Sequence, residues 1–187
     1  MGAPGSAAPG RLETVRRFVN TSDIEAATDT LTTPERLVAW LCDAELLGRE
    51  VTADQTDLRR AVELREALRS AMASNHDGAP VAADAVATLN ETADRAGLQL
   101  AFTADPRWAA RPTAKGVDAA LGTLLAVVAA AMTEDTWRRL KVCANDACRW
   151  AFYDHSRARA GKWCSMQACG NRVKQQAWRA RREGEQR

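Results

Sequence analysis

Four of the five cysteines in this 187-residue chain lie close together near the C-terminus. They form two pairs, each with four residues between its members, and fifteen residues separate the pairs: Cys143 and Cys148, then Cys164 and Cys169. Two short loops that each supply two sulfur ligands are typical of a tetrahedral zinc site. A reducing cytosol disfavours structural disulfides, so clustered thiols there indicate a metal. We therefore expect one Zn²⁺ held by these four cysteines.

The expected zinc site is structural. Four thiolates fill every position of tetrahedral zinc and leave none for a water molecule to be activated. A module of about 45 residues buries too little apolar surface to fold alone, so the metal supplies folding energy on the order of 10 kcal/mol. Buried free thiols fit this polar, basic stretch poorly. His155 could replace one cysteine as a ligand, but it is better interpreted as a surface residue. No catalytic triad or Gly-rich phosphate loop occurs, and we predict that the protein is not an enzyme.

Local signals indicate how the cysteines are positioned. Ser165 can cap a helix that starts beside Cys164 and carries Cys169. Residues 137–142 read as an extended segment that leads to a turn holding the first pair. A turn followed by a helix N-terminus is the layout of treble-clef zinc modules. We expect Trp150 and Trp163 to pack around the metal, and Asp154 to brace the intervening loop.

The preceding residues predict a mainly helical body. Thr33 before Pro34 is a helix start signal, with Gly48 as a stop, and Asp54 caps a second helix. Apolar residues recur at helical spacing along 82–96 and 115–132, while 98–102 and 108–111 read as strands, and Trp40, Cys42 and Trp108 read as core residues. The fold class is therefore mainly α with short β elements (α+β): an α-rich N-terminal domain and a small treble-clef-like four-cysteine zinc finger. The predicted boundaries are a flexible tail at 1–10, the α-rich domain at 11–135, the finger at 136–183 and a tail at 184–187.

Two features bear on localisation. The longest uncharged run, 119–133, has 15 residues, short of the ~20 that a bilayer needs. The first ten residues lack the charge and apolar core of a signal peptide. We expect a cytoplasmic protein without membrane contact, and the Ala- and Arg-rich composition is associated with bacteria.

Charge divides the chain at the same place as the cysteines do. Residues 141–187 carry 11 Lys and Arg against 4 Asp and Glu, a net charge of +7, whereas residues 1–140 carry 15 against 20, a net charge of −5. A basic module on an acidic body suggests contact with phosphate. The candidate nucleic-acid-binding residues are Arg149, Arg157, Arg159, Lys162, Arg172, Lys174 and Arg179. Two alternatives stay open: a solvated charged face, and bracing of the zinc thiolates by Asn171 and Arg172.

Several of these residues resemble known family motifs. The finger, with its two cysteine pairs, the stretch 152–156 and the run 163–174, resembles the CGNR zinc finger, which is named for residues 169–172. Residues 18–21 and 37–41 are similar to the start of the ABATE domain, although 13–17 are more charged than the apolar first strand usual there. The resemblance implies a proposed stress-induced transcription regulator whose basic finger binds nucleic acid.

The sequence as a whole favours a zinc-dependent, DNA-binding transcriptional regulator, with DNA ahead of RNA. The N-terminal domain would regulate the finger through a small-molecule effector, a protein partner or homodimerisation. One alternative is a zinc-stabilised protein-interaction module, including a finger that docks on the acidic body of its own chain. The other alternative is an RNA-binding protein.

Overall fold

A computed structural model describes residues 7–102, 108–175 and 182. Helices dominate, and the short strands of the described part form antiparallel pairs, so the α+β class is confirmed. The helices are α1 (Leu12–Val19), α2 (Pro34–Asp43), α3 (Gln55–Ala73), α4 (Ala83–Ala96) and α5 (Gly116–Thr133). The strand pairs are β1–β2 (Ser22–Asp23 and Thr28–Asp29), β3–β4 (Gln99–Phe102 and Trp108–Arg111) and β5–β6 (Leu140–Val142 and Ala151–Tyr153). Among the described residues there are also two short helical turns, η1 (Trp137–Arg139) and η2 (Met166–Gly170), and residues 171–175 continue from η2 as a helix.

The predicted helix starts are confirmed by their capping bonds. The Thr33 hydroxyl accepts a hydrogen bond from the Arg36 amide, and Asp54 forms a reciprocal capping box at the start of α3. The stop predicted at Gly48 was wrong, because α2 already ends at Asp43. There Glu45 takes a left-handed conformation (φ 57°) and the Leu46 amide donates to the Leu41 carbonyl, which closes the helix.

The segment for which the family resemblance implied a strand is a helix. In α1, Leu12, Val15, Phe18 and Val19 are buried, while Glu13 and Arg16 form a partly buried ion pair at 2.7 Å. Apolar residues at spacings of three and four give a helix one buried face even when the residues between are charged. The charges at 13–17 therefore lie off the buried face of α1: Arg17 is exposed, while Arg16 is partly buried and donates to the Ala151 carbonyl of β6 at 3.3 Å.

Helix α5 is the central helix of the body. It is long and apolar enough to pass as a membrane span by length and composition, with a mean hydropathy of 1.7. It packs against α1, α3, α4 and β4, which is the environment of a core helix. Gly122 is needed there, because a Cβ atom at this position would collide with Ala96 of α4.

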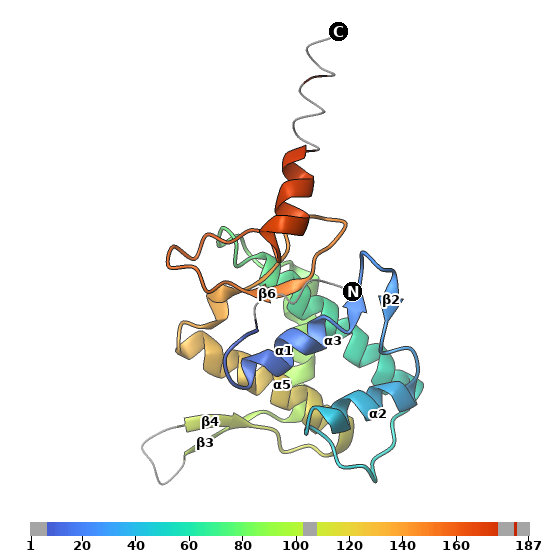
Figure 1. The fold of residues 1–187 in the computed structure, drawn as a ribbon. Helices are drawn as coiled ribbons and strands as arrows, with labels where there is room; N and C mark the ends of the chain where they lie inside the picture. Colours follow the sequence, from blue (N-terminus) through green and yellow to red (C-terminus); the bar gives the residue numbers. More distant parts are fainter. Residues whose placement is uncertain (1–6, 103–107, 176–181, 183–187) are drawn as a thin grey trace.

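The hydrophobic core does not stop at the predicted boundary between residues 135 and 136. Leu140, Val142, Ala151 and Tyr153 of β5 and β6 belong to the same buried cluster as the helices. In Figure 1, β6 lies against the helical body, and the helix that follows η2 projects away from it. The four-cysteine module therefore rests on the body through its strands.

The predictions for the N-terminal tail and for the core tryptophans have different outcomes. Of the predicted N-terminal tail the structure describes residues 7–10, in which Ala8 is buried and its amide donates to Glu13 at 2.7 Å. Trp40 packs against the core beside Phe18, with ring centroids 5.3 Å apart. Trp108 was wrongly placed in the core: it is 43% exposed on β4, near the exposed Phe102 of β3.

Candidate metal centre and basic surface of the finger

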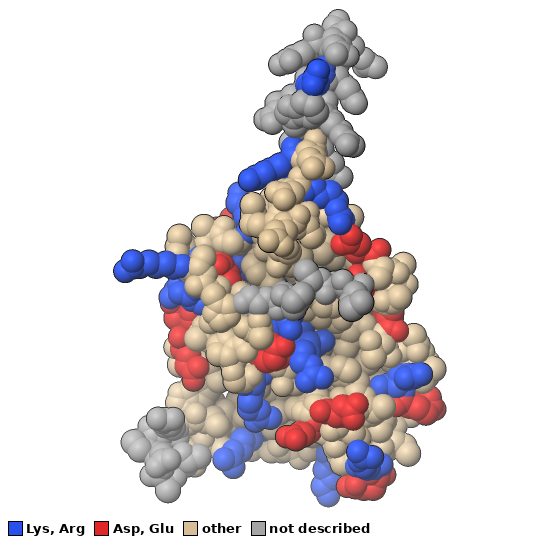
Figure 2. All heavy atoms as spheres, viewed as in Figure 1, with Lys and Arg blue, Asp and Glu red and all other residues tan. Residues whose placement is uncertain are grey.

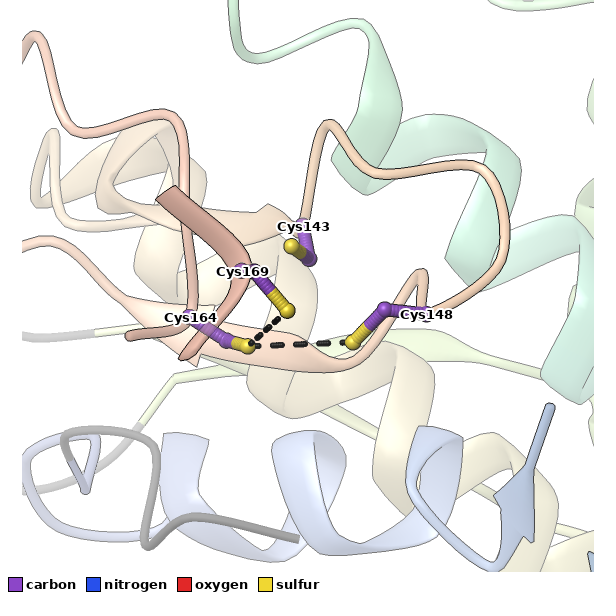
Figure 3. A group of neighbouring side chains, drawn as sticks. All are labelled: Cys143, Cys148, Cys164 and Cys169. Carbon is purple, nitrogen blue, oxygen red and sulfur yellow. Dashed lines mark hydrogen bonds between the residues drawn. The ribbon is translucent and has the colours of Figure 1, made fainter. Parts of the chain in front are cut away.

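The four cysteine sulfurs converge on one point (Figure 3). All lie within 4.8 Å of one another, and the Cys164 sulfur is 3.7 Å from those of both Cys148 and Cys169. A tetrahedron with Zn–S bonds of about 2.3 Å has sulfur–sulfur distances of about 3.8 Å. The spacing and donor type thus fit a four-coordinate zinc ion.

The first pair sits on a turn between β5 and β6. The Cys143 amide donates to the Trp150 carbonyl at 2.9 Å, which extends the strand pairing by one residue. The Cys148 amide donates to the Asn145 carbonyl at 2.8 Å, so the turn curls back toward Cys143. After Cys148 the chain passes through Arg149 in a left-handed conformation (φ 48°) and enters β6.

The second pair sits at a helix N-terminus, as predicted. The Ser165 hydroxyl accepts a hydrogen bond from the Ala168 amide at 3.3 Å, and η2 carries Cys169. Gly170, after the last cysteine, packs closely beneath the side chains of Met166 and Trp163. Trp150 and Trp163 pack against the cysteine cluster, also as predicted. His155 is exposed and contacts the Ala7 carbonyl instead of the sulfurs.

The crowded thiols need a positive charge between them. A hydrogen bond from Cys148 lowers the pKa of Cys143 to about 2, so one thiolate forms readily. Hydrogen bonds with Cys143 raise the pKa of Cys148 to about 12 and that of Cys164 well above its ordinary value. Further ionisation is therefore opposed by the first thiolate until a cation offsets its charge. Soft sulfur ligands around a closed centre favour Zn²⁺ among the common divalent ions.

A buried ion pair braces the loop between the cysteine pairs. Lys141 and Asp154, 2% and 3% exposed, face each other at 3.1 Å. Asp154 also accepts hydrogen bonds from the amides of Ser156 and Gly161. Burial alone would raise the pKa of Asp154, but hydrogen bonds from Ser156, Lys141 and Gly161 lower it to about 2. The bracing role predicted for Asp154 is confirmed, whereas its partner Lys141 was not among the predicted residues.

A second buried cation joins the body to the finger. Arg69 of α3 is 1% exposed and donates to the carbonyls of Val19 and Ser22 in the body and of Arg149 beside Cys148, the last at 2.9 Å. Burial lowers the pKa of Arg69, and Glu66, at 3.0 Å, opposes that shift. Arg69 therefore fixes the turn that carries the first cysteine pair to the helical body.

Side chains of the body also bond the finger's strands. The Asn20 side chain exchanges two hydrogen bonds with the backbone of Ala151, at 2.9 and 2.8 Å. Asn75 donates to the Leu140 carbonyl at 2.8 Å, and His76 contacts the Val142 carbonyl at 2.6 Å. These contacts join residues that are more than 60 positions apart, so only the tertiary structure reveals them.

The predicted nucleic-acid-binding residues differ in their surroundings. Arg157, Arg159, Lys162, Arg172 and Lys174 are exposed, Arg149 is half-buried, and Arg179 lies outside the described residues. Arg159 pairs with Asp135 at 2.5 Å and Arg172 pairs with Glu25 at 2.6 Å. In Figure 2, Lys and Arg side chains gather around the base of the projecting C-terminal helix. Asn171 was a candidate for bracing the zinc thiolates, but its side chain donates to the Gln167 carbonyl instead.

Comparison with known families agrees with the division of the chain into a helical body and a four-cysteine finger. The family model ABATE, described as "Putative stress-induced transcription regulator", matches residues 13–137. The model of the CGNR zinc finger matches residues 139–182. No curated protein matches the sequence. Since the first match spans about two thirds of the 187 residues, the chain belongs to the ABATE family and carries a CGNR zinc finger after its ABATE domain.

Proposed function

We propose that this protein is a zinc-dependent, DNA-binding transcriptional regulator of the cytoplasm. The observation that carries the proposal is the exposed basic surface of the finger, made by Arg157, Lys162 and Lys174 together with the paired Arg159 and Arg172. In the described part of the chain, Arg157, Lys162 and Lys174 take no part in an ion pair with the body. Such cations are available to phosphate oxygens.

The proposed role is binding and not catalysis. A closed centre of four thiolates offers no coordination position to a substrate, so zinc would act by holding the finger folded. The residues that hold it would be Cys143, Cys148, Cys164 and Cys169. The ABATE domain would support the finger through Arg69, Asn20 and the shared core.

The test is binding of the zinc-loaded full chain to mixed duplex DNA and to single-stranded RNA across a salt series. Three or four phosphate contacts predict that log K falls with log salt with a slope of about −2.7 to −3.6 for a duplex. The variant Lys174→Gln should weaken binding and reduce the slope by about 0.9. The matched control is Arg59→Gln, an exposed arginine of α3 in the body, which should leave both unchanged.

Each outcome bears on one class of function. Salt-sensitive binding that favours duplex DNA supports the proposal, and preference for RNA replaces DNA by RNA as the target. Absence of binding to either, with one zinc ion per chain, would overturn the proposal and move protein interaction to first place.

One observation favours protein interaction as a second candidate function. Leu100 and Phe102 of β3 are 67% and 84% exposed, and Trp108 of β4 is 43% exposed. Exposed apolar side chains on neighbouring strands are typical of protein contacts. Light scattering of the wild type and of Phe102→Lys tests whether the chain self-associates through these strands. A dimer in the wild type that is lost in the variant supports self-association, and a monomeric wild type excludes it.

A further inference from the structure

Arg172, one of the candidate phosphate-binding residues, is held by the body of its own chain. Its guanidinium lies 2.6 Å from the carboxylate of Glu25, a residue 147 positions earlier in the sequence. Both side chains are a little over 40% exposed, so the pair lies at the surface where nucleic acid would approach.

The body presents Glu25 on a firmly anchored hairpin. Glu25 lies in the turn between β1 and β2, where the Asp23 carboxylate accepts the Ala26 amide at 3.0 Å. At the end of the hairpin, Arg65 holds Asp29 with two hydrogen bonds of 2.8 Å each. The carboxylate of Glu25 is thus supplied by a fixed turn.

The finger holds Arg172 through its position next to the metal centre. Arg172 comes three residues after Cys169, in the helix that begins at the metal centre. A guanidinium binds carboxylates and phosphates through the same donors. A phosphate group that approaches Arg172 therefore competes with Glu25 for the guanidinium, and the two anions repel each other.

We propose that Glu25 mimics a DNA phosphate and occupies Arg172, so that the ABATE domain lowers the affinity of its own zinc finger for the DNA backbone. This inference rests on the proposed DNA-binding function. Arg159 is engaged in a similar way by Asp135, which directly precedes the finger. The body thus competes with phosphate at two of the finger's cations.

The test measures duplex DNA binding by the zinc-loaded full chain for the wild type, Glu25→Gln, Arg172→Gln and the double variant. Releasing an exposed ion pair should raise the affinity of Glu25→Gln about two- to fivefold. The salt slope should steepen by about 0.9, because Arg172 gains a phosphate. The control is Glu91→Gln, which removes the same charge from a pair within α4.

The double variant distinguishes the contact from a general effect of charge. If Glu25 acts through Arg172, Glu25→Gln gives no gain in the Arg172→Gln background. An equal gain in both backgrounds, or a gain as large for Glu91→Gln, overturns the inference while leaving DNA binding intact. If no variant binds DNA with zinc in place, the proposed function fails, and the inference fails with it.

Discussion

Replacing Arg69 tests whether the body positions the zinc ligands. Arg69→Ala leaves the carbonyls of Val19, Ser22 and Arg149 without their buried donor. Removing one member of a buried, charged hydrogen-bond network costs about 3–5 kcal/mol. For a chain of this length, each kcal/mol lowers the melting temperature by about 2–4 °C, so a loss near 4 kcal/mol predicts a decrease of about 8–16 °C.

The same change should loosen the metal centre. Arg149 follows Cys148 directly, and its carbonyl loses its bond to the body in the variant. Residues that support metal ligands typically contribute tenfold or more to metal affinity. We expect zinc transfer to a chromogenic chelator to be at least tenfold more favourable for Arg69→Ala than for the wild type.

Two further variants make the result decisive. Arg69→Lys keeps the charge but cannot reach three carbonyls at once, and we expect an intermediate loss. Arg59→Ala, on the same helix but 59% exposed, should change stability by less than about 0.5 kcal/mol. The reasoning is refuted if Arg69→Ala and Arg59→Ala unfold at the same temperature, or if Arg69→Ala retains zinc as firmly as the wild type.

Three other predictions follow from the packing. Removing zinc with a chelator should unfold the finger and lower the melting temperature of the whole chain in one transition, because the core is shared; calorimetry that shows an unchanged body transition would contradict this. Lys141→Met leaves Asp154 buried without its partner and should cost about 3–5 kcal/mol in urea denaturation, whereas a cost below 1 kcal/mol would exclude an important ion pair. Gly122→Ala should cost about 1–3 kcal/mol by overpacking against Ala96, and Ala96→Gly in the same chain should restore most of it.

The sequence predicted features that depend on residues close together in the chain. The capping residues Thr33 and Asp54 lie within three positions of the amides they bond, and each cysteine pair spans six residues. Such signals are local, because side chain and backbone meet whatever the rest of the chain does. The spacing of the apolar residues in α1 is also a local signal of a helix. The charged residues between them obscured it, because they resemble a break in an apolar segment.

The residues that attach the finger to the body could not be found in this way. Arg69 and Lys141 are charged, and sequence alone places such residues on the surface. Their burial depends on acceptors such as the Arg149 carbonyl and the Asp154 carboxylate, which only the folded chain brings near. Strand β6 was missed for a related reason: three buried residues, Ala151–Tyr153, show no alternation.

The bond between Asn20 and Ala151 also protects a sheet edge. Strand β6 pairs with β5 through Trp150 and Asp154, so the backbone of Ala151 faces the opposite edge, where a two-stranded sheet has no further strand. Open edges of this kind invite pairing with other molecules and aggregation. The Asn20 amide satisfies both polar groups of Ala151 and takes the place of a third strand. Together with Arg16, which also donates to the Ala151 carbonyl, Asn20 covers this edge of the finger with side chains of the ABATE domain, and separating the two parts would expose it.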